Sequence, residues 1–494
     1  MYRAYEAKAV RAAEEPLLAA REPLMERASY ALATRVASLR APGRRVLALV
    51  GKGNNGGDAL FAASYLARRG IFVTAAFAGD VHAAGLSAAR RAGVRIVEID
   101  PDDVTTLLGI ARDCGIWIDG LLGIGATGGA REPYATWIRS LAAEREAMAA
   151  EPVVVAVDVP SGIGVDDADL PGPVLPADLT LSMGCLKPAH LLPPARYACG
   201  HVEVVELGLG PHLGEPAVRE LSDADVAGLW RVPGREDHKY RRGVVGLLTG
   251  SRDYPGAGVL SAAGALGGGP GMVRYLGTSP DVVPAHPEVV PGPGRVQSWV
   301  MGSGLIDLAP AQEALTQALA EDLPVVLDAG AICLAYRRTL SSRVVLTPHA
   351  GELAALLAAV SSQNWDRARV EAQPVRAARE AAELTGATVL AKFATSIIAS
   401  PDALFVEGGG PGWTGTAGSG DVLAGLTGTI LATHADDLAR CPERTVLYAA
   451  AAAHVHARAA ARAADVFTGQ IGHPITATDI ARALPLTIGS MLND

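Results

Sequence analysis

The stretch "GTAGSGDVLAG", residues 415–425, places three glycines directly before Asp421, where a helical stretch begins. The first N–H groups of a helix have no partners within the helix, and the helix dipole is positive at that end. Glycines let an anionic ligand approach these N–H groups closely. The stretch therefore predicts a phosphate-transfer site in which Asp421 takes a proton from an attacking hydroxyl. The alternative is that Asp421 is only the N-cap of the helix, which leaves the glycines unexplained.

A second glycine-rich turn, "GKGNNGGDAL" at residues 51–60, follows the apolar run "RVLALV" and precedes another helical stretch. Gly51, Gly53 and Gly56 fit the pattern G-x-G-x-x-G, which is typical of dinucleotide-binding turns in α/β proteins. An NAD-dependent dehydrogenase is therefore one interpretation. The pattern does not require the two asparagines or the aspartate of this turn, so those residues need another explanation.

Apolar β-branched runs alternate with Ala- and Arg-rich helical stretches over the first two hundred residues. The alternation stops in the polar stretch 210–242 and then resumes. Apolar strands separated by helices are typical of a mainly parallel sheet that is covered on both faces. We therefore predict an α/β fold throughout, with one domain at 1–212 and a second at 222–494.

The composition excludes several classes of protein. The chain of 494 residues is 49% hydrophobic, carries a net charge of −9 and has five scattered cysteines. The acidic balance argues against a nucleic-acid-binding protein, and the cysteine pattern argues against a disulfide frame or a zinc site. No apolar run reaches the ~18 residues of a membrane span, and the first residues lack the apolar core of a signal peptide. We expect a cytoplasmic homo-oligomer with reduced thiols and without nucleic-acid or membrane partners.

Other stretches of the C-terminal half carry a resemblance to a known family. In chain order they are "KYRRGVVGLLTGS" (239–251), "YPGAGVLSAAGAL" (254–266), "MGSGL" (301–305), "PVVLDAGAI" (324–332), "LTPHAGEL" (346–353) and "ITATDIARALP" (475–485). Together with "TAGSGDVLAG", they resemble the ribokinase-like domain of ADP-dependent NAD(P)H-hydrate dehydratases, over essentially all of residues 222–494.

The N-terminal half resembles a second family. "GNNGGD", "LMERA" (24–28), "IDGLLGIGATGG" (118–129) and "VDVPSG" (157–162) are similar to the motifs of NAD(P)H-hydrate epimerases. The order of the two halves is that of the bifunctional bacterial NAD(P)H-hydrate repair enzymes. This resemblance implies a Rossmann-like three-layer domain followed by a ribokinase-like α/β domain. It also implies hydrates of NADH and NADPH as substrates, whose hydroxyl next to the ring nitrogen is either R or S. The epimerase family interconverts the two forms, and the dehydratase family acts on the S form.

The epimerase resemblance implies a role for individual residues of the N-terminal half. Asp158 would be the acid/base group, although it could instead cap the turn that follows its strand. A potassium ion would lie among the oxygens of Asn55, Asp119 and Ser161, which suit a hard cation. The asparagines could also form a left-handed turn. The hydrate would bind to Asp158 and to Asn54, Asn55, Gly56, Gly57, Asp58, Gly123, Ile124, Gly125, Ala126, Thr127, Gly128, Gly129 and Tyr134.

The dehydratase resemblance implies that Asp421 deprotonates the ring hydroxyl for attack on a nucleotide phosphoryl group, with ADP and Mg²⁺ as cofactors. Gly418 and Gly420 would donate to the transferred phosphate. The family usually has a glycine at the position of Phe393. The larger phenylalanine side chain is expected to narrow the nucleotide pocket. The nucleotide would contact Lys392, Phe393, Ala394, Thr395 and Ser396, whereas the hydrate would contact Ala257, Gly304, His349 and Asp421. His349 could instead be a purely structural histidine.

Two other functions are compatible with parts of the sequence. A small-molecule kinase of the ribokinase-like superfamily, with the N-terminal half as a sensor, would use the same anion-binding turn. A binding scaffold without catalysis is a third interpretation, but Asn55, Asp119 and Asp158 are all present. The expected binding partners are therefore NADH or NADPH hydrates and an adenine nucleotide.

Overall fold

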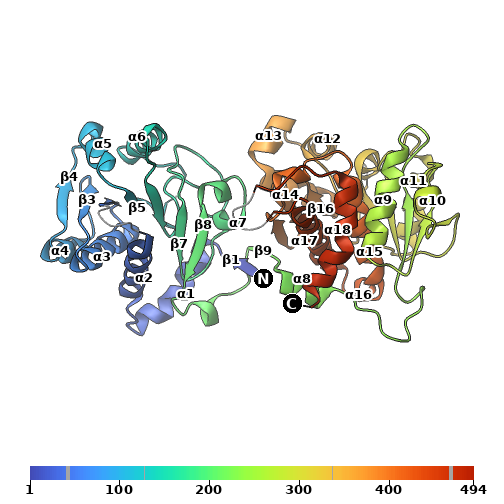
Figure 1. The fold of residues 1–494 in the computed structure, drawn as a ribbon, viewed down its shortest axis with the longest axis horizontal. Helices are drawn as coiled ribbons and strands as arrows, with labels where there is room; N and C mark the ends of the chain where they lie inside the picture. The colour runs from blue at the N-terminus through green and yellow to red at the C-terminus, as the bar shows by residue number, and fades with distance from the viewer. Residues whose placement is uncertain (40–44, 127, 337, 467–470, 494) are drawn as a thin grey trace. The chain divides into compact units, whose positions relative to one another are not determined.

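The computed structural model describes residues 1–39, 45–126, 128–336, 338–466 and 471–493, and it shows two compact units (Figure 1). One unit is Arg3–Val218, and the other is Arg219–Asp494 together with Met1–Tyr2. The division after Val218 falls between the predicted domains, 1–212 and 222–494. None of the helices in the described parts of the chain combines the length and apolar character needed to cross a bilayer.

The N-terminal unit is built on a seven-stranded sheet in which every pairing is parallel. The strands follow the order β4 (Arg95–Glu98), β3 (Val73–Phe77), β2 (Val46–Val50), β5 (Ile116–Gly120), β6 (Val153–Val157), β7 (Leu179–Met183) and β8 (His201–Val205). Chain order reverses between β2 and β5, so the strand ends there form a switch point where ligands of such sheets bind.

Helices cover both faces of this sheet. Successive residues of its central strand face opposite sides and so contribute to two different cores. In β2, Val46, Ala48 and Val50 belong to one core, whereas Leu47 and Leu49 belong to the other. The first core includes α1 (Ala7–Ala19), α2 (Leu24–Leu39), α3 (Asn54–Arg68) and α4 (Ala83–Arg91), and the second includes α5 (Val104–Arg112) and α6 (Tyr134–Ala147) (Figure 1). The three-layer α/β prediction for this half is confirmed.

The C-terminal unit contains an eleven-stranded sheet. Its order is β1 (Tyr2–Ala4), β9 (Val218–Glu220), β18 (Leu404–Glu407), β17 (Ser396–Ala399), β16 (Thr388–Ala391), β15 (Val344–Leu346), β14 (Val325–Leu327), β13 (Ser298–Met301), β10 (Val244–Leu248), β11 (Met272–Tyr275) and β12 (Val290–Pro291). The pairings from β16 to β18 are antiparallel, and the pairings from β10 to β16 are parallel. The prediction of a mainly parallel sheet therefore holds, with an antiparallel meander at one side.

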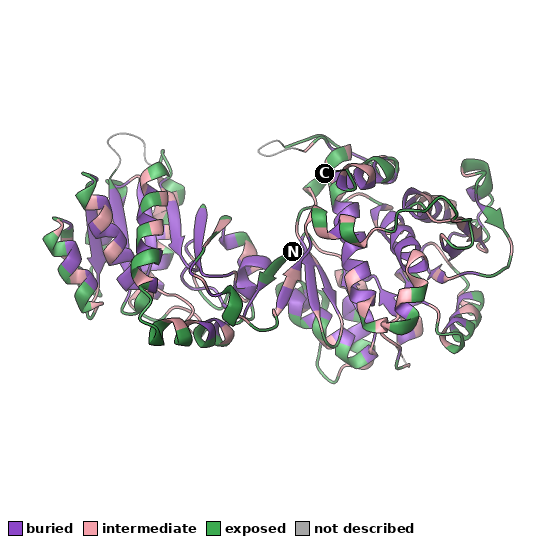
Figure 2. Ribbon diagram, turned by 90° about the horizontal axis from the view of Figure 1, so that it is seen from below, coloured by how far each residue is buried: buried purple, intermediate pink, exposed green. Residues whose placement is uncertain are grey.

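Eleven helices of the described segments pack around this sheet. They are α8 (Asp223–Leu229), α9 (Pro255–Gly267), α10 (Val282–Ala285), α11 (Ala309–Ala320), α12 (Ala350–Val360), α13 (Arg367–Ala372), α14 (Pro374–Thr385), α15 (Ser419–Thr433), α16 (Ala435–Arg440), α17 (Thr445–Ala463) and α18 (Ala477–Met491). Figure 2 shows the central strands of both units as buried, whereas edge strands such as β4 and β12 are partly or fully exposed.

Helix α15, which carries the glycine-rich turn at its start, is buried along most of its length. Its close approach to α9 requires glycine: a Cβ at Gly425 would lie 2.0 Å from the carbonyl oxygen of Ser261. A Cβ at Gly264 would likewise lie 2.1 Å from the carbonyl oxygen of Val422. The tight packing of these two helices fixes the position of the turn that precedes α15.

Candidate active sites

The glycine-rich turn of the C-terminal unit forms the start of α15. Gly418 is the N-cap residue, with φ of 86°, and a Cβ there would lie 2.3 Å from Leu260 Cδ1. Glycine is therefore required at this position both for its backbone angle and for space. The helix begins at Ser419, two residues before the predicted start, so Asp421 lies inside the first turn. No side chain caps this helix end, and the interpretation of Asp421 as an N-cap is wrong.

The environment of Asp421 suits a proton acceptor. Burial raises the pKa of its carboxyl to about 7, and the negative charge of Asp328 contributes to the increase. Lys392 and a hydrogen bond from Ser303 oppose it. A group whose pKa lies near the working pH is the most effective general base.

Asp421 faces a buried ion pair that the sequence did not reveal. Lys392 Nζ lies 2.8 Å from Asp328 Oδ1. Asp328 also accepts hydrogen bonds from Ser303 Oγ at 2.7 Å and from Thr347 Oγ1 at 2.6 Å. Burial alone would raise the pKa of Asp328, but Lys392 and these bonds hold it below its ordinary value. The pair therefore stays ionised, with a fixed ammonium group beside the phosphate turn.

The ammonium group of Lys392 lies directly against the anion-binding turn. A Cβ at Gly420 would be 3.1 Å from Lys392 Nζ. The backbone N–H of Lys392 donates a hydrogen bond to the Pro348 carbonyl at 2.8 Å. A cation and the free N–H groups of a helix start thus meet at one place, which is the arrangement expected for a transferred phosphoryl group.

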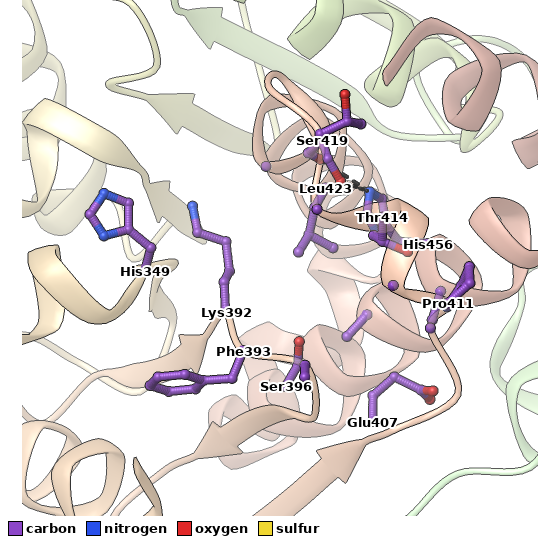
Figure 3. A pocket seen from close by; sticks show the side chains of 18 residues that line it. His349, Lys392, Phe393, Ser396, Glu407, Pro411, Thr414, Ser419, Leu423 and His456 are labelled. Carbon is purple, nitrogen blue, oxygen red and sulfur yellow. Dashed lines mark hydrogen bonds between the residues drawn. The ribbon is translucent and has the colours of Figure 1, made fainter. Parts of the chain in front are cut away.

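A cavity of about 590 Å³ opens beside this turn (Figure 3). Of the predicted nucleotide contacts, Lys392, Phe393, Ala394, Ser396 and Gly420 line it. Figure 3 shows the ring of Phe393 on the same side as His349, whereas Pro411 and Thr414 lie on the other side of Lys392. Thr395, which is buried, and Gly418, which packs against Leu260, do not line the cavity.

The residues predicted to hold the hydrate also approach this region. A Cβ at Gly304, which has φ of 67°, would lie 2.6 Å from the Cβ of Ala257, so these two residues are neighbours. Ser303, next to Gly304, bonds to Asp328 and to Asp421. The structure thus brings Ala257 and Gly304 toward Asp421.

His349 has both a structural and an exposed side. Its Nδ1 accepts hydrogen bonds from the N–H groups of Gly351 and Glu352, at 3.0 and 3.2 Å, and so caps α12. The side chain is nevertheless 61% exposed and lines the cavity. Nδ1 therefore has a structural role, while Nε2 lies 3.5 Å from Glu352 Oε1.

His456 on α17 supports the phosphate turn from behind. Its Nε2 donates to the Ser419 carbonyl at 3.0 Å and lies 3.3 Å from the Ser419 hydroxyl (Figure 3). Burial lowers the pKa of His456 to about 4, so the ring is neutral at physiological pH. It acts as a fixed hydrogen-bond donor that orients Ser419.

The N-terminal unit has a separate carboxylate site at the end of β6. Asp158 adopts φ of 67°, an unusual backbone angle for a residue with a side chain. Its Oδ1 accepts hydrogen bonds from the Lys187 ammonium group and, at 2.8 Å, from the N–H of Met183. Lys187 is fully buried and also donates to the Met183 carbonyl at 2.8 Å. Asp158 therefore binds the segment after β7 and does not merely cap its own turn.

His190 fixes the backbone at Asp158. The N–H of Lys187 donates to His190 Nδ1 at 3.0 Å, so the ring proton is on Nε2, which donates to the Asp158 carbonyl at 2.9 Å. Burial and the nearby Lys187 charge lower the pKa of His190 to about 4. Neutral His190 thus holds the strained residue in place.

Asn55, Asp119 and Ser161 form one connected network at the switch point. Asp119 Oδ1 accepts from Ser161 Oγ at 2.6 Å, and Oδ2 accepts from Ser161 N at 2.8 Å. Asn55 Nδ2 donates to the carbonyls of Leu122 and Val157, both at 2.7 Å. Burial raises the pKa of Asp119, although the bonds from Ser161 oppose the increase. The three predicted potassium ligands are brought together.

The turn at 51–57 is tight, because a Cβ at Gly56 would lie 1.9 Å from the Gly51 carbonyl oxygen. Asn54 and Asn55 are the first residues of α3, and neither has a positive φ. The left-handed-turn interpretation of the asparagines is therefore wrong. Gly57 lies under the His82 ring, where a Cβ would be 3.1 Å from Cγ.

The loop after β5 is only partly joined to this site. A Cβ at Gly123 would lie 2.6 Å from Asn55 Oδ1, and the Ile124 carbonyl accepts from Arg11 at 2.7 Å. Ala126 donates back to Gly123 at 2.9 Å, Gly125 lies beside Arg11 and Gly128 has φ of 72°. The contacts of Gly129 are to Pro171, and Tyr134 packs edge-on against Trp137. Thr127 lies outside the described residues.

Comparisons with known proteins agree with this division into two sites. The family described as NAD(P)H-hydrate dehydratase matches residues 245–485, and the family described as YjeF-related protein N-terminus matches residues 21–189. A bifunctional NAD(P)H-hydrate repair enzyme from Mycobacterium leprae is 42% identical over 494 residues, which covers 94% of this chain and 95% of that one. The chain belongs to the bifunctional NAD(P)H-hydrate repair enzymes.

Other relatives match the whole repair enzyme or one half of it. The protein of the same name from Mycobacterium tuberculosis H37Rv is 42% identical over 451 residues, covering 87% of this chain and 89% of that one. An NAD(P)H-hydrate epimerase from Clavibacter michiganensis is 44% identical over 223 residues, covering 44% of this chain and 94% of its own. The crystal structure of a Bacillus subtilis ADP/ATP-dependent NAD(P)H-hydrate dehydratase, obtained with ATP and Mg²⁺, covers 56% of this chain and 99% of its own at 26% identity and a TM-score of 0.48.

Sequence reasoning missed two charged partners in this repair enzyme, Lys187 and Asp328. Only "PVVLDAGAI" gave a signal, since Asp328 ends an apolar strand as Asp158 does. The glycine pattern at 51–56 belongs to the epimerase half of a repair enzyme, so the interpretation as an NAD-dependent dehydrogenase is wrong.

Proposed function

We propose that each unit performs one step of the repair of hydrated NADH and NADPH, with Asp158 and Asp421 as the two reacting carboxyl groups. The observation that supports this most is the presence of two separate strand-end sites, each with its own glycine turn and carboxylate. One unit would interconvert the R and S hydrates, and the other would remove water from the S hydrate.

In the C-terminal unit, Asp421 would take the proton of the hydrate hydroxyl as that oxygen attacks the terminal phosphoryl group of ADP. AMP leaves, and phosphate then departs from the ring carbon as a neighbouring carbon loses a proton, which restores the double bond. Lys392 and the N–H groups at Gly418 and Gly420 would stabilise the transferred phosphoryl group. His349 would orient the hydrate from the rim of the cavity.

Mg²⁺ would enter this site with the nucleotide. Among the described residues there is no group of three or more His, Cys, Asp or Glu side chains that could hold a metal by itself. Mg²⁺ is commonly held by one or two carboxylates together with phosphate oxygens. Glu352 lies within electrostatic range of Lys392 and fits that requirement. When bound, the ion would neutralise the phosphate charge.

A potassium ion fits the N-terminal site. The Asp119 carboxylate is fully buried, and its hydrogen-bond partners among the described residues are neutral, namely Ser161 and the N–H of Leu121. A monovalent cation held by Asp119, Ser161 and Asn55 would balance this buried charge. It would also fix the loop at Gly123, and thereby one wall of the hydrate site. A homo-oligomer and a cytoplasmic location stay predictions.

The test is incubation of the full-length protein with a mixture of R and S NADH hydrates, K⁺, Mg²⁺ and either ADP or ATP. We expect complete recovery of the reduced-nicotinamide absorbance, with AMP and phosphate as products when ADP is used. A lasting phosphorylated product without NADH would instead support the small-molecule kinase, which would use the same phosphate turn.

A further inference from the structure

Two carboxyl groups of the N-terminal site have opposite surroundings. Asp158 is paired with the buried Lys187 ammonium group and accepts a second bond from the N–H of Met183. Asp58 is also buried, but its hydrogen bond is with the neutral Ser29 hydroxyl, at 3.0 Å. Asp158 therefore has a cation as its partner, whereas Asp58 has no comparable cation among the described contacts.

The backbone brings Asp58 to the same site as Asp158. Asn55 Nδ2 donates to the carbonyl of Val157, the residue before Asp158, at 2.7 Å. Asp58 follows Asn55 by three positions in α3, so the two side chains lie on the same face of that helix. The first turn of α3 therefore places Asp58 next to the strand end that carries Asp158.

Burial and the neighbouring negative charges favour the protonated form of Asp58. Burial raises its pKa to about 7; the bond from Ser29 opposes the increase, and the charges of Asp158 and Glu14 add to it. Glu14 on α1 also has a raised pKa, caused by burial and by Asp158, with Lys187 and Arg11 opposing. His190 is neutral, and burial raises the pKa of the Cys185 thiol to about 11, so neither adds a charge.

Inverting the hydrate carbon requires an acid and a base on opposite faces of the ring. The hydroxyl leaves as water once it is protonated, and the electron pair of the ring nitrogen forms a C=N bond with that carbon. A water molecule then adds to the other face and loses a proton. Water is released and taken up once each, and no oxidant or reductant is needed. Two carboxyl groups held in different protonation states suit this task.

We propose that Asp58 is the second catalytic residue of epimerisation: it protonates the departing hydroxyl while Asp158, paired with Lys187, accepts the proton of the incoming water. In the reverse direction the two groups exchange roles, and proton exchange with solvent resets them. This inference rests on the proposed epimerase function of the N-terminal unit.

The experiment measures conversion of pure R hydrate to S hydrate by the full-length protein without nucleotide, with the epimers resolved by chromatography. Asp58→Asn should lower the rate by about 10²–10⁴-fold, as expected for loss of an acid/base group. The matched control is Asp113→Asn, since the Asp113 side chain is 70% exposed. Dehydration of S hydrate by the same Asp58→Asn protein should be unchanged, because that site lies in the other unit. A thermal melt that matches the wild type shows that the N-terminal unit of the variant has folded.

The pH profile separates proton transfer from mere positioning. Wild-type epimerisation should fall above pH about 7, where Asp58 loses its proton. Ser29→Ala removes the bond that lowers this pKa, so the fall should move to higher pH. Epimerisation by Asp58→Asn within a few-fold of the wild-type rate, or a residual rate with the unchanged high-pH fall, would overturn the proposal. Absence of epimerisation by the wild type itself would overturn the proposed function instead.

Discussion

Replacing Asp421 with asparagine separates proton transfer from phosphate binding in the dehydratase unit. The amide has nearly the same shape but cannot accept a proton, while Lys392 and the N–H groups of the turn remain. Loss of a general base lowers rates by about 10²–10⁴-fold, or about 2.7–5.4 kcal/mol of activation free energy. We therefore expect dehydration of S hydrate by Asp421→Asn to fall by this factor, with little change in nucleotide affinity.

The same substitution should stabilise the protein. The folded-state pKa of Asp421 is about 7, against the ordinary 3.8, so the folded state binds the proton more tightly than the unfolded state. Stability contributed by this group is complete below pH 3.8 and is lost as the pH rises to about 7. At pH 8 the ionised carboxyl therefore costs the folded state up to roughly 4 kcal/mol, from ~1.4 kcal/mol for each pKa unit. Asparagine removes that cost, so the Tm at pH 8 should not decrease and is expected to rise.

The wild-type rate of dehydration should decrease as the pH falls, because a general base acts only in its ionised form. With a pKa of about 7, the ionised fraction of Asp421 falls roughly tenfold between pH 8 and pH 6. Single-turnover dehydration of S hydrate with ADP and Mg²⁺ measures the decrease in rate between pH 8 and pH 6. Calorimetry measures nucleotide binding. Asp436→Asn, on the exposed surface of α16, is the matched control. Dehydration by Asp421→Asn within a factor of a few of wild type would refute the reasoning.

Three other substitutions test the remaining parts of the two sites. Asp158→Ala should leave S-hydrate dehydration intact but make a mixed hydrate pool disappear in two phases, the R form only at the spontaneous rate; loss of S-hydrate turnover would mean one shared site. Gly418→Ala should weaken nucleotide binding and lower the Tm, because its Cβ would lie 2.3 Å from Leu260 Cδ1 at φ of 86°, and an unchanged affinity would contradict the assigned role. Lys392→Met leaves the Asp328 carboxylate buried without its cation and should cost about 3–5 kcal/mol of unfolding free energy in denaturant titrations. Unfolding at the wild-type denaturant midpoint would show that the ion pair contributes nothing.

The local pattern of the chain was enough to predict the two α/β units and their glycine turns. Apolar strands such as "RVLALV" are buried on both faces, so their composition identifies them without knowledge of the partner strands. The predicted starts of the helices were less accurate than their existence, since α15 begins at Ser419 and α3 at Asn54. Each helix begins within its glycine-rich turn, before the apolar residues by which the sequence reveals it. The antiparallel meander of β16, β17 and β18 was not visible, since short buried strands read alike in either direction.

The sequence by itself determined which residue types can carry the chemistry, because a carboxylate after a glycine turn has few other uses. What only the tertiary structure decided is the charge state of those carboxylates. Lys187 lies 29 residues after Asp158, and Asp328 lies 64 residues before Lys392, yet each forms a buried ion pair. A pKa depends on burial and on neighbouring charges, and both are set by packing between distant segments. The raised pKa values of Asp58 and Asp421, and the pairing of Asp158 with Lys187, therefore arise only on folding.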